Sequence, residues 1–116
     1  MGLQIAIRQS GNITILDLQG KATIGRPNDD LSAQLRKLIE SGTRNVILNL
    51  EHLIQLDSSS LSTIVRALTS LRTRNGSLCL LRPHGNVLLV LETLHLQEVI
   101  ACFDDEPSAL ASFSHP

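Results

Sequence analysis

The segment from Asn45 to Leu68 constrains the fold more than any other part of this chain. It begins with an almost continuous apolar run, Val46 to Leu50, which is typical of a strand covered on at least one face. A short spacer leads to Asp57 and three serines, and leucines and other apolar residues then recur at helical spacing over residues 61–71. A strand that feeds an amphipathic helix predicts right-handed β-α-β crossovers and parallel strands.

The first twenty residues predict a β-hairpin ahead of the parallel part of the sheet. Leu3, Ile5 and Ile7 alternate with smaller or polar residues, and Gly11-Asn12 then breaks the run. An extended, apolar-rich pattern resumes over residues 13–19. Because a hairpin is antiparallel and the later crossovers are parallel, we expect a mixed sheet.

Helix and strand signals alternate over the rest of the chain. Residues 28–30 carry side chains that cap helices, ahead of a helix that Gly42 ends. Asn75-Gly76 closes the helix that follows Asp57, and a strand is expected over residues 77–81.

The last third of the chain predicts a loop over residues 83–86, a short helix over 87–94 and a strand over 99–103. Acidic residues and a proline at 104–107 predict the start of a final helix that ends near Phe113. The sequence thus predicts an α/β fold with the order ββαβαβαβα, in one domain covering residues 1–116.

Composition excludes several classes of protein. With 116 residues, of which 42% are hydrophobic, the chain can build a core without disulfides or metal. Cys79 and Cys102 are far apart in the sequence and are expected to be small buried hydrophobic residues. Because their pattern does not call for an oxidising compartment, a cytoplasmic location is expected. No apolar run approaches the roughly 20 residues of a membrane span. Without Trp, Tyr or a basic stripe, direct nucleic-acid binding is not expected.

The junction Asp57-Ser58-Ser59-Ser60 is the strongest candidate site. A hydroxyl there lies near a helix N-terminus, where free N–H groups and the helix dipole favour a negative charge such as a phosphate. Asp and Ser are also preferred N-caps, so one of these residues could simply cap the helix. The two roles are compatible, and the pattern leaves Asp57 and all three serines as candidates.

Other chemistries fit the residues less well. A receiver domain with a phosphorylated Asp needs an acidic pair after the first strand, where this chain has Gly11-Asn12. A serine hydrolase needs a histidine beside the nucleophile, and the four histidines are scattered. The stretch from Gly20 to Pro27 is not a phosphate-binding loop of the Walker type, and the acidic run 104–106 reads as a solvated helix start. We expect no enzyme activity, metal or cofactor.

Several motifs resemble the STAS family, the domain named for sulfate transporters and anti-sigma factor antagonists. They are Leu48-Asn49-Leu50-Glu51, Leu56-Asp57-Ser58-Ser59 ahead of a leucine-bearing helix, Gly76-Ser77-Leu78, and Phe103-Asp104-Asp105-Glu106. The likeness covers nearly the whole chain and is greatest to the free-standing antagonists, since transporter-linked STAS domains follow membrane segments.

This resemblance implies a partner-switching protein. The unphosphorylated antagonist would bind an anti-sigma factor that is also a serine kinase, which frees the sigma factor. The kinase would phosphorylate the serine that matches Ser58 and end the interaction, and a phosphatase would restore it. Asp57, Ser59 and Ser60 would belong to the contact surface, with Thr23 and Ile24 in a neighbouring loop.

Two departures from the family pattern motivate an alternative. The family usually has glycines where this chain has Ser60 and Ser62, and it often has an acidic residue where Thr23 stands. If close approach of a kinase depends on those glycines, the serines would slow phosphorylation or select another partner. The alternative is a STAS module that is not phosphorylated and serves as a structural or accessory subunit of a larger complex.

Overall fold

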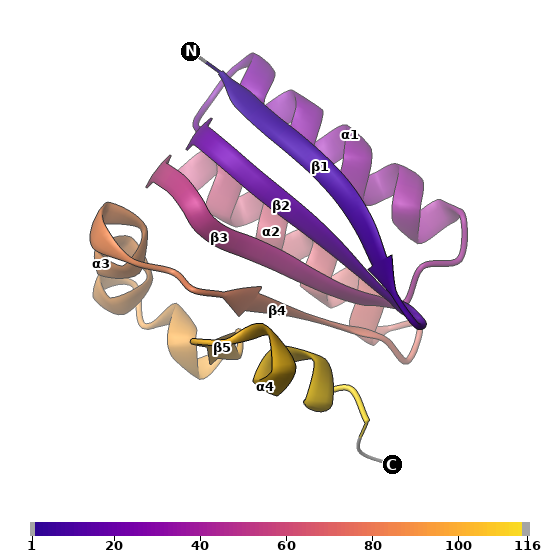
Figure 1. The fold of residues 1–116 in the computed structure, drawn as a ribbon. Helices are drawn as coiled ribbons and strands as arrows, with labels where there is room; N and C mark the ends of the chain where they lie inside the picture. Colours follow the sequence, from indigo (N-terminus) through magenta and orange to yellow (C-terminus); the bar gives the residue numbers. More distant parts are fainter. Residues whose placement is uncertain (1, 115–116) are drawn as a thin grey trace.

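A computed structural model describes residues 2–114 and shows a five-stranded sheet with the strand order β1-β2-β3-β4-β5 (Figure 1). The antiparallel hairpin of β1 (Leu3–Ser10) and β2 (Ile13–Ala22) is followed by β3 (Asn45–Leu56), β4 (Ser77–Leu81) and β5 (Cys102–Phe103), which all pair in parallel. The predicted mixed sheet is confirmed.

The helices complete the predicted element order. They are α1 (Arg26–Glu40), α2 (Ser58–Arg72), α3 (Gly85–Thr93) and α4 (Glu106–Ala111), with a single 3-10 turn, η1 (Leu96–Glu98), between α3 and β5. In Figure 1, α1 and α2 lie together behind the sheet and α4 lies in front of it. None of the helices in residues 2–114 is both long and apolar enough to span a bilayer.

The main core lies between the sheet and α1 and α2, and α3 contributes to it at one end. Fully buried side chains come from alternate positions of the strands, such as Leu16 on β2 and Leu48 on β3, and from one stripe of each helix, such as Leu35 and Ile64. A smaller cluster on the opposite face of the sheet includes Ile47 and is covered by α4. Both faces of the central strands are therefore buried, which explains their continuous apolar runs.

Several element boundaries differ from the sequence prediction; for example, β2 runs to Ala22 and α3 begins at Gly85. Helix α1 begins at Arg26 rather than after residues 28–30, because Pro27 occupies its first turn and no side chain caps Gly25. Strand β3 runs to Leu56, so the expected spacer is part of the strand. Strand β5 contains two residues, because the turn that follows η1 occupies Val99 and Ile100 at the start of the segment predicted as strand.

The acidic start of the last helix is more than a solvated cap. Asp105 caps α4, accepting a hydrogen bond from the Ser108 N–H at 2.8 Å. Glu106 instead binds Arg8 on β1, with 2.6 Å between Oε1 and Nη2, and Arg8 also binds Asp17 on β2 at 2.8 Å. This network ties α4 to the hairpin, so the prediction that residues 104–106 are merely solvated is wrong for Glu106.

The Arg8 network makes stability sensitive to acid. Its hydrogen bonds from Arg8 lower the pKa of Glu106, and they also lower that of Asp17 although partial burial of Asp17 acts in the opposite direction. A carboxyl with a lowered folded-state pKa stabilises the fold above its unfolded pKa, and that stabilisation disappears as the pH falls through the folded value.

We therefore expect Arg8→Met to lower the free energy of unfolding at pH 7, and the difference from the native protein to shrink below about pH 4. Urea denaturation at pH 7, 4 and 2.5 measures this, with Arg26→Met as the control because the Arg26 side chain is 92% exposed. A difference that stays constant with pH would contradict the assigned role of the two carboxylates.

Candidate functional site

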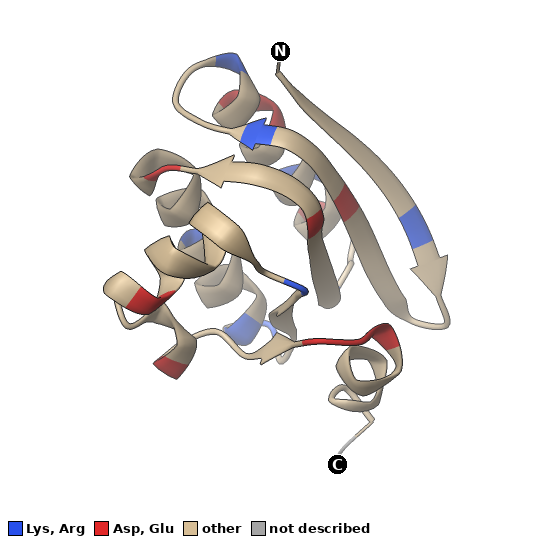
Figure 2. Cartoon of the chain, turned by 60° about the vertical axis from the view of Figure 1, so that its left-hand side comes forward, with Lys and Arg blue, Asp and Glu red and all other residues tan. Residues whose placement is uncertain are grey.

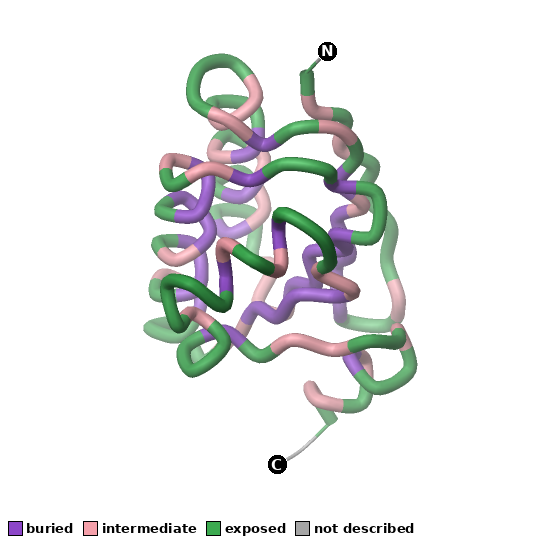
Figure 3. Tube along the Cα trace, turned by 90° about the vertical axis from the view of Figure 1, so that its left-hand side faces the viewer, coloured by how far each residue is buried: buried purple, intermediate pink, exposed green. Residues whose placement is uncertain are grey.

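The candidate site forms where the carboxyl ends of β2 and β3 meet the N-termini of α1 and α2. The main chain joins the two connections directly, since the Asp57 N–H donates to the Ala22 carbonyl at 3.1 Å. Figure 3 views the molecule from this end and shows that the connecting segments are largely exposed, whereas the strands that support them are buried. The fold thus places a loop that precedes α1 beside the start of α2.

Asp57 is the N-cap of α2 and organises the site. Its Oδ1 accepts hydrogen bonds from the Ser60 N–H at 3.1 Å and the Ser59 hydroxyl at 2.6 Å, and its Oδ2 accepts from the Ile24 N–H at 2.7 Å. Partial burial by itself would raise the pKa of Asp57, but these hydrogen bonds outweigh it and lower the pKa below its ordinary value. Asp57 is therefore ionised at neutral pH and anchors the loop to the helix.

The three serines occupy different environments. Ser58 is exposed, and its hydroxyl has no hydrogen-bond partner within residues 2–114. Ser59 is half-buried and its hydroxyl is engaged with Asp57. Ser60 is completely buried, at 0% exposure. The hydroxyl that is free to meet a second molecule is that of Ser58.

Ser60 does not belong to the surface predicted for it. Its side chain points into the core because it precedes Ile64 by one helical turn and so lies on the apolar stripe of α2. No other residue of 2–114 pairs with its hydroxyl. In this conformation Ser60 has no exposed area with which to contact a docked protein, so the predicted contact would require α2 to move.

The buried Ser60 hydroxyl should destabilise the protein, because a polar atom buried without a partner loses its hydrogen bonds to water and gains none in return. We expect Ser60→Ala to raise the free energy of unfolding by about 1 kcal/mol. Ser62→Ala, an exposed position on the same helix, is the matched control for helix propensity, which is worth about 0.5 kcal/mol. Urea denaturation of both variants provides the comparison. If Ser60→Ala gains no more free energy of unfolding than Ser62→Ala, the unpaired Ser60 hydroxyl is not destabilising.

The loop predicted to lie beside the site is present there. Thr23 is half-buried, and the Ile24 side chain is 78% exposed although its N–H is held by Asp57. A second exposed apolar side chain, Ile54, is 59% exposed near the end of β3, and sequence reasoning missed it because β3 was expected to end earlier. Ile24 and Ile54 put apolar area on the two segments that lead into the charged junction.

A hydrogen bond between the side chains of Asn28 and Thr63 links α1 to α2 next to the site. The Thr63 hydroxyl donates to Oδ1 of Asn28 at 2.7 Å and lies 3.2 Å from the Ser59 carbonyl oxygen. Asn28 was expected to cap α1, but it links α1 to the first turns of α2 instead. The spacing between the two helix N-termini is therefore fixed by side chains as well as by the main chain.

Within residues 2–114, no three His, Cys, Asp or Glu side chains are grouped so that they could hold a metal ion. Both oxygens of Asp57 are engaged by neighbouring donors. What the junction presents to a second molecule is a free hydroxyl, a carboxylate and exposed apolar side chains.

A family model of the STAS domain matches residues 4–109. The chain belongs to the STAS family. Solved structures agree with that assignment at the level of the fold. An anti-sigma factor antagonist from Mycobacterium paratuberculosis is 10% identical, with a TM-score of 0.86 over 96% of its own length and 98% of this STAS protein.

Two further solved structures share the fold. The Bacillus cell-fate determinant SpoIIAA in its phosphorylated form is 19% identical, with a TM-score of 0.74 over 95% of this chain and 99% of its own. A sulfate transporter family protein from Wolinella succinogenes is 16% identical, with a TM-score of 0.71 over 89% of this chain and 85% of its own. At these identities the likeness establishes the shared fold.

Proposed function

We propose that this STAS protein is a non-enzymatic anti-sigma factor antagonist of the cytoplasm and that Ser58 is its phosphoacceptor. The observation that carries the proposal is the contrast among the three serines: Ser58 is exposed and unengaged, whereas Ser59 is bonded to Asp57 and Ser60 is buried. The similarity to anti-sigma factor antagonists supports an anti-sigma factor as the partner. We propose that this partner is also the serine kinase.

In the unphosphorylated state, the partner would dock on the exposed junction. Ile24 and Ile54 supply apolar area, and Asp57 holds the Ile24 segment against the start of α2. Thr23 and Ser59 lie beside this area, and both are half-buried. Because the loop of such a surface is already ordered, binding does not cost the conformational entropy of ordering it.

Phosphorylation would act through charge at this surface. The Ser58 hydroxyl oxygen forms a bond to the γ-phosphorus of ATP, ADP leaves, and the hydroxyl proton passes to a base of the kinase. The product carries about −1.5 to −2 charges at the N-terminus of α2, where the helix dipole tolerates them without refolding. Because neighbouring Asp57 is already negative, the added charge would repel the docked partner, and a phosphatase would reverse the change.

ATP dependence tests this mechanism. The complex of the native protein with its kinase partner, followed by size-exclusion chromatography, should dissociate when Mg-ATP is added. The complex formed by Ser58→Ala should persist under the same conditions. Dissociation of both complexes by ATP would show that release does not depend on Ser58, and a native complex that resists ATP would favour a structural STAS module.

A further inference from the structure

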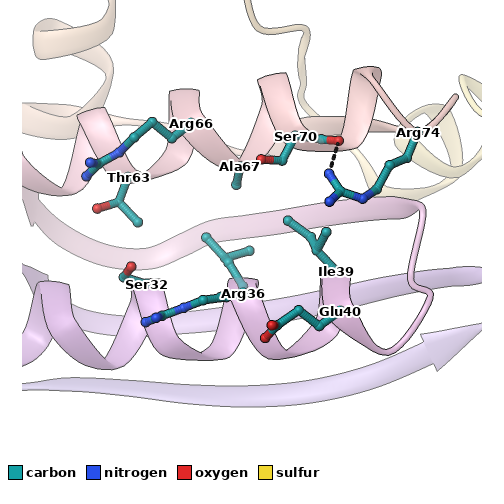
Figure 4. A pocket seen from close by; sticks show the side chains of 10 residues that line it. Ser32, Arg36, Ile39, Glu40, Thr63, Arg66, Ala67, Ser70 and Arg74 are labelled. Carbon is teal, nitrogen blue, oxygen red and sulfur yellow. Dashed lines mark hydrogen bonds between the residues drawn. The ribbon is translucent and has the colours of Figure 1, made fainter.

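A groove of about 410 Å³ lies between α1 and α2, on the side of these helices that faces away from the sheet (Figure 4). Its floor is formed by Leu35, Ile39 and Ala67, which are 2%, 8% and 6% exposed. Figure 4 shows Arg36 beside the groove on α1, Arg66 on α2 and Arg74 just after the end of α2. The apolar side chains of the floor are thus nearly covered, and the exposed charged side chains at the rim are the three arginines and Glu40.

The guanidinium groups of the groove arginines are largely unpaired. Arg36 and Arg66 make no ion pair or side-chain hydrogen bond within residues 2–114, and Arg74 donates one Nη to the Ser70 carbonyl at 3.0 Å. Glu40 is the single acidic residue in the lining, and α2 contains no Asp or Glu at all.

Charge is unevenly distributed over the chain, although the net charge is only −1. Residues 83–116 contain five acidic residues and no Lys or Arg. Figure 2 shows acidic positions along the segments that follow β4. The α1–α2 face is therefore a locally basic surface of a slightly acidic protein, which favours an anionic occupant.

The shape of the groove selects among anionic occupants. A small molecule is usually enclosed over 70–90% of its surface, as a rough rule for ligand pockets, whereas this groove is open and its arginines are exposed. Arg66 lies on α2 and Arg74 in the turn just after it, so positive charge is spread along the groove, which suits carboxylates repeated along a polymer. The lining has no aromatic side chain on which a nucleic-acid base could stack.

We propose that the α1–α2 groove binds an acidic helical segment of a protein partner, whose carboxylates pair with Arg36, Arg66 and Arg74. Glutamates at positions i, i+4 and i+8 of such a helix line one face over about 12 Å and can meet arginines that are spread along the groove. This second interface is distinct from the Ser58 junction, because Ile24, Asp57 and Ser58 do not line the groove. Thr63, which supports the junction through Asn28, is the lining residue nearest to it in sequence. The proposal does not depend on whether Ser58 is phosphorylated.

The test uses a fluorescein-labelled 16-residue helical peptide of alanine and glutamate, with glutamates at i, i+4, i+8 and i+12, and its glutamine counterpart. Fluorescence anisotropy with the full chain should show binding of the glutamate peptide only, weakening as salt rises from 20 to 200 mM. The variant Arg36→Gln/Arg66→Gln should bind about tenfold more weakly, in line with the loss of two exposed ion pairs.

The matched control is Arg26→Gln/Lys37→Gln, which removes the same charge from exposed positions outside the groove lining. It should bind within twofold of the native protein, and so should Ser58→Asp. Equal losses in both double variants would indicate nonspecific attraction and overturn the proposal. So would tighter binding of a 16-nucleotide oligothymidylate than of the peptide, no binding of the peptide, or association of the chain with itself in analytical ultracentrifugation that occludes the groove.

Discussion

Ser58→Asp is expected to weaken binding to the anti-sigma factor by at least about 100-fold, whereas Ser58→Ala should stay within about threefold of the native protein. The aspartate adds a permanent negative charge at the start of α2, next to the ionised Asp57, and so imitates the repulsion that a phosphate would produce. Removing the Ser58 hydroxyl removes no hydrogen bond within residues 2–114, so alanine should be tolerated. Isothermal titration calorimetry measures both affinities.

Ser114→Asp is the matched control for this comparison. It makes the same change in net charge at an exposed position beyond α4, away from the junction. Its affinity should equal that of the native protein. If Ser58→Asp binds as tightly as Ser58→Ala, charge at Ser58 does not govern docking, and the structural STAS module becomes the better explanation.

Gly76→Ala is expected to lower the free energy of unfolding by roughly 3 kcal/mol or more. Gly76 lies in the turn between α2 and β4, where its N–H donates to the Leu71 carbonyl at 2.7 Å. A β-carbon there would overlap the Arg44 carbonyl oxygen and lie 2.8 Å from the carbonyl carbon. That neighbour is main chain at the start of β3 and accepts a bond from the Ser77 N–H, so it has little freedom to move.

Gly42→Ala separates this clash from ordinary glycine strain. Gly42 has a φ of +105°, but nothing lies within 4 Å of an added β-carbon, so the cost there is backbone strain of about 1 kcal/mol. Thermal denaturation followed by circular dichroism should show a clearly lower Tm for Gly76→Ala than for Gly42→Ala. A Gly76→Ala protein that melts like the native one would contradict the close approach of the two connections.

The elements that could be predicted from the sequence are those that depend on local patterns. The hairpin at Gly11-Asn12 and the strand-to-helix passage through Asp57 depend on turn and capping residues within a few positions, and both are confirmed. The extension of β3 was missed because register shifts interrupt its pairing with β2 and disturb the alternation that marks a strand. The start of α1 was expected after residues 28–30, because their side chains can cap a helix, although Pro27 also suits the first turn of a helix.

The site shows the same division. Asp57 as the helix cap follows from local sequence, but its bond to the Ile24 N–H joins residues 33 positions apart and required the structure. The contact between Arg8 and Glu106, 98 positions apart, likewise could not be predicted from the sequence. The burial of Ser60, in contrast, was available from its helical spacing to Ile64 and Leu71, and the resemblance to the family drew attention to its surface role instead.

Mapping the phosphate by mass spectrometry, after incubation of the native protein with its anti-sigma factor kinase and Mg-ATP, tests the central claim most directly. Because Ser58 is exposed and unengaged while Ser59 is held by Asp57 and Ser60 is buried, we expect one phosphate, on Ser58, and none in Ser58→Ala. Phosphate found solely on Ser59, Ser60 or another residue, or no phosphate under conditions in which the two proteins bind, would contradict it.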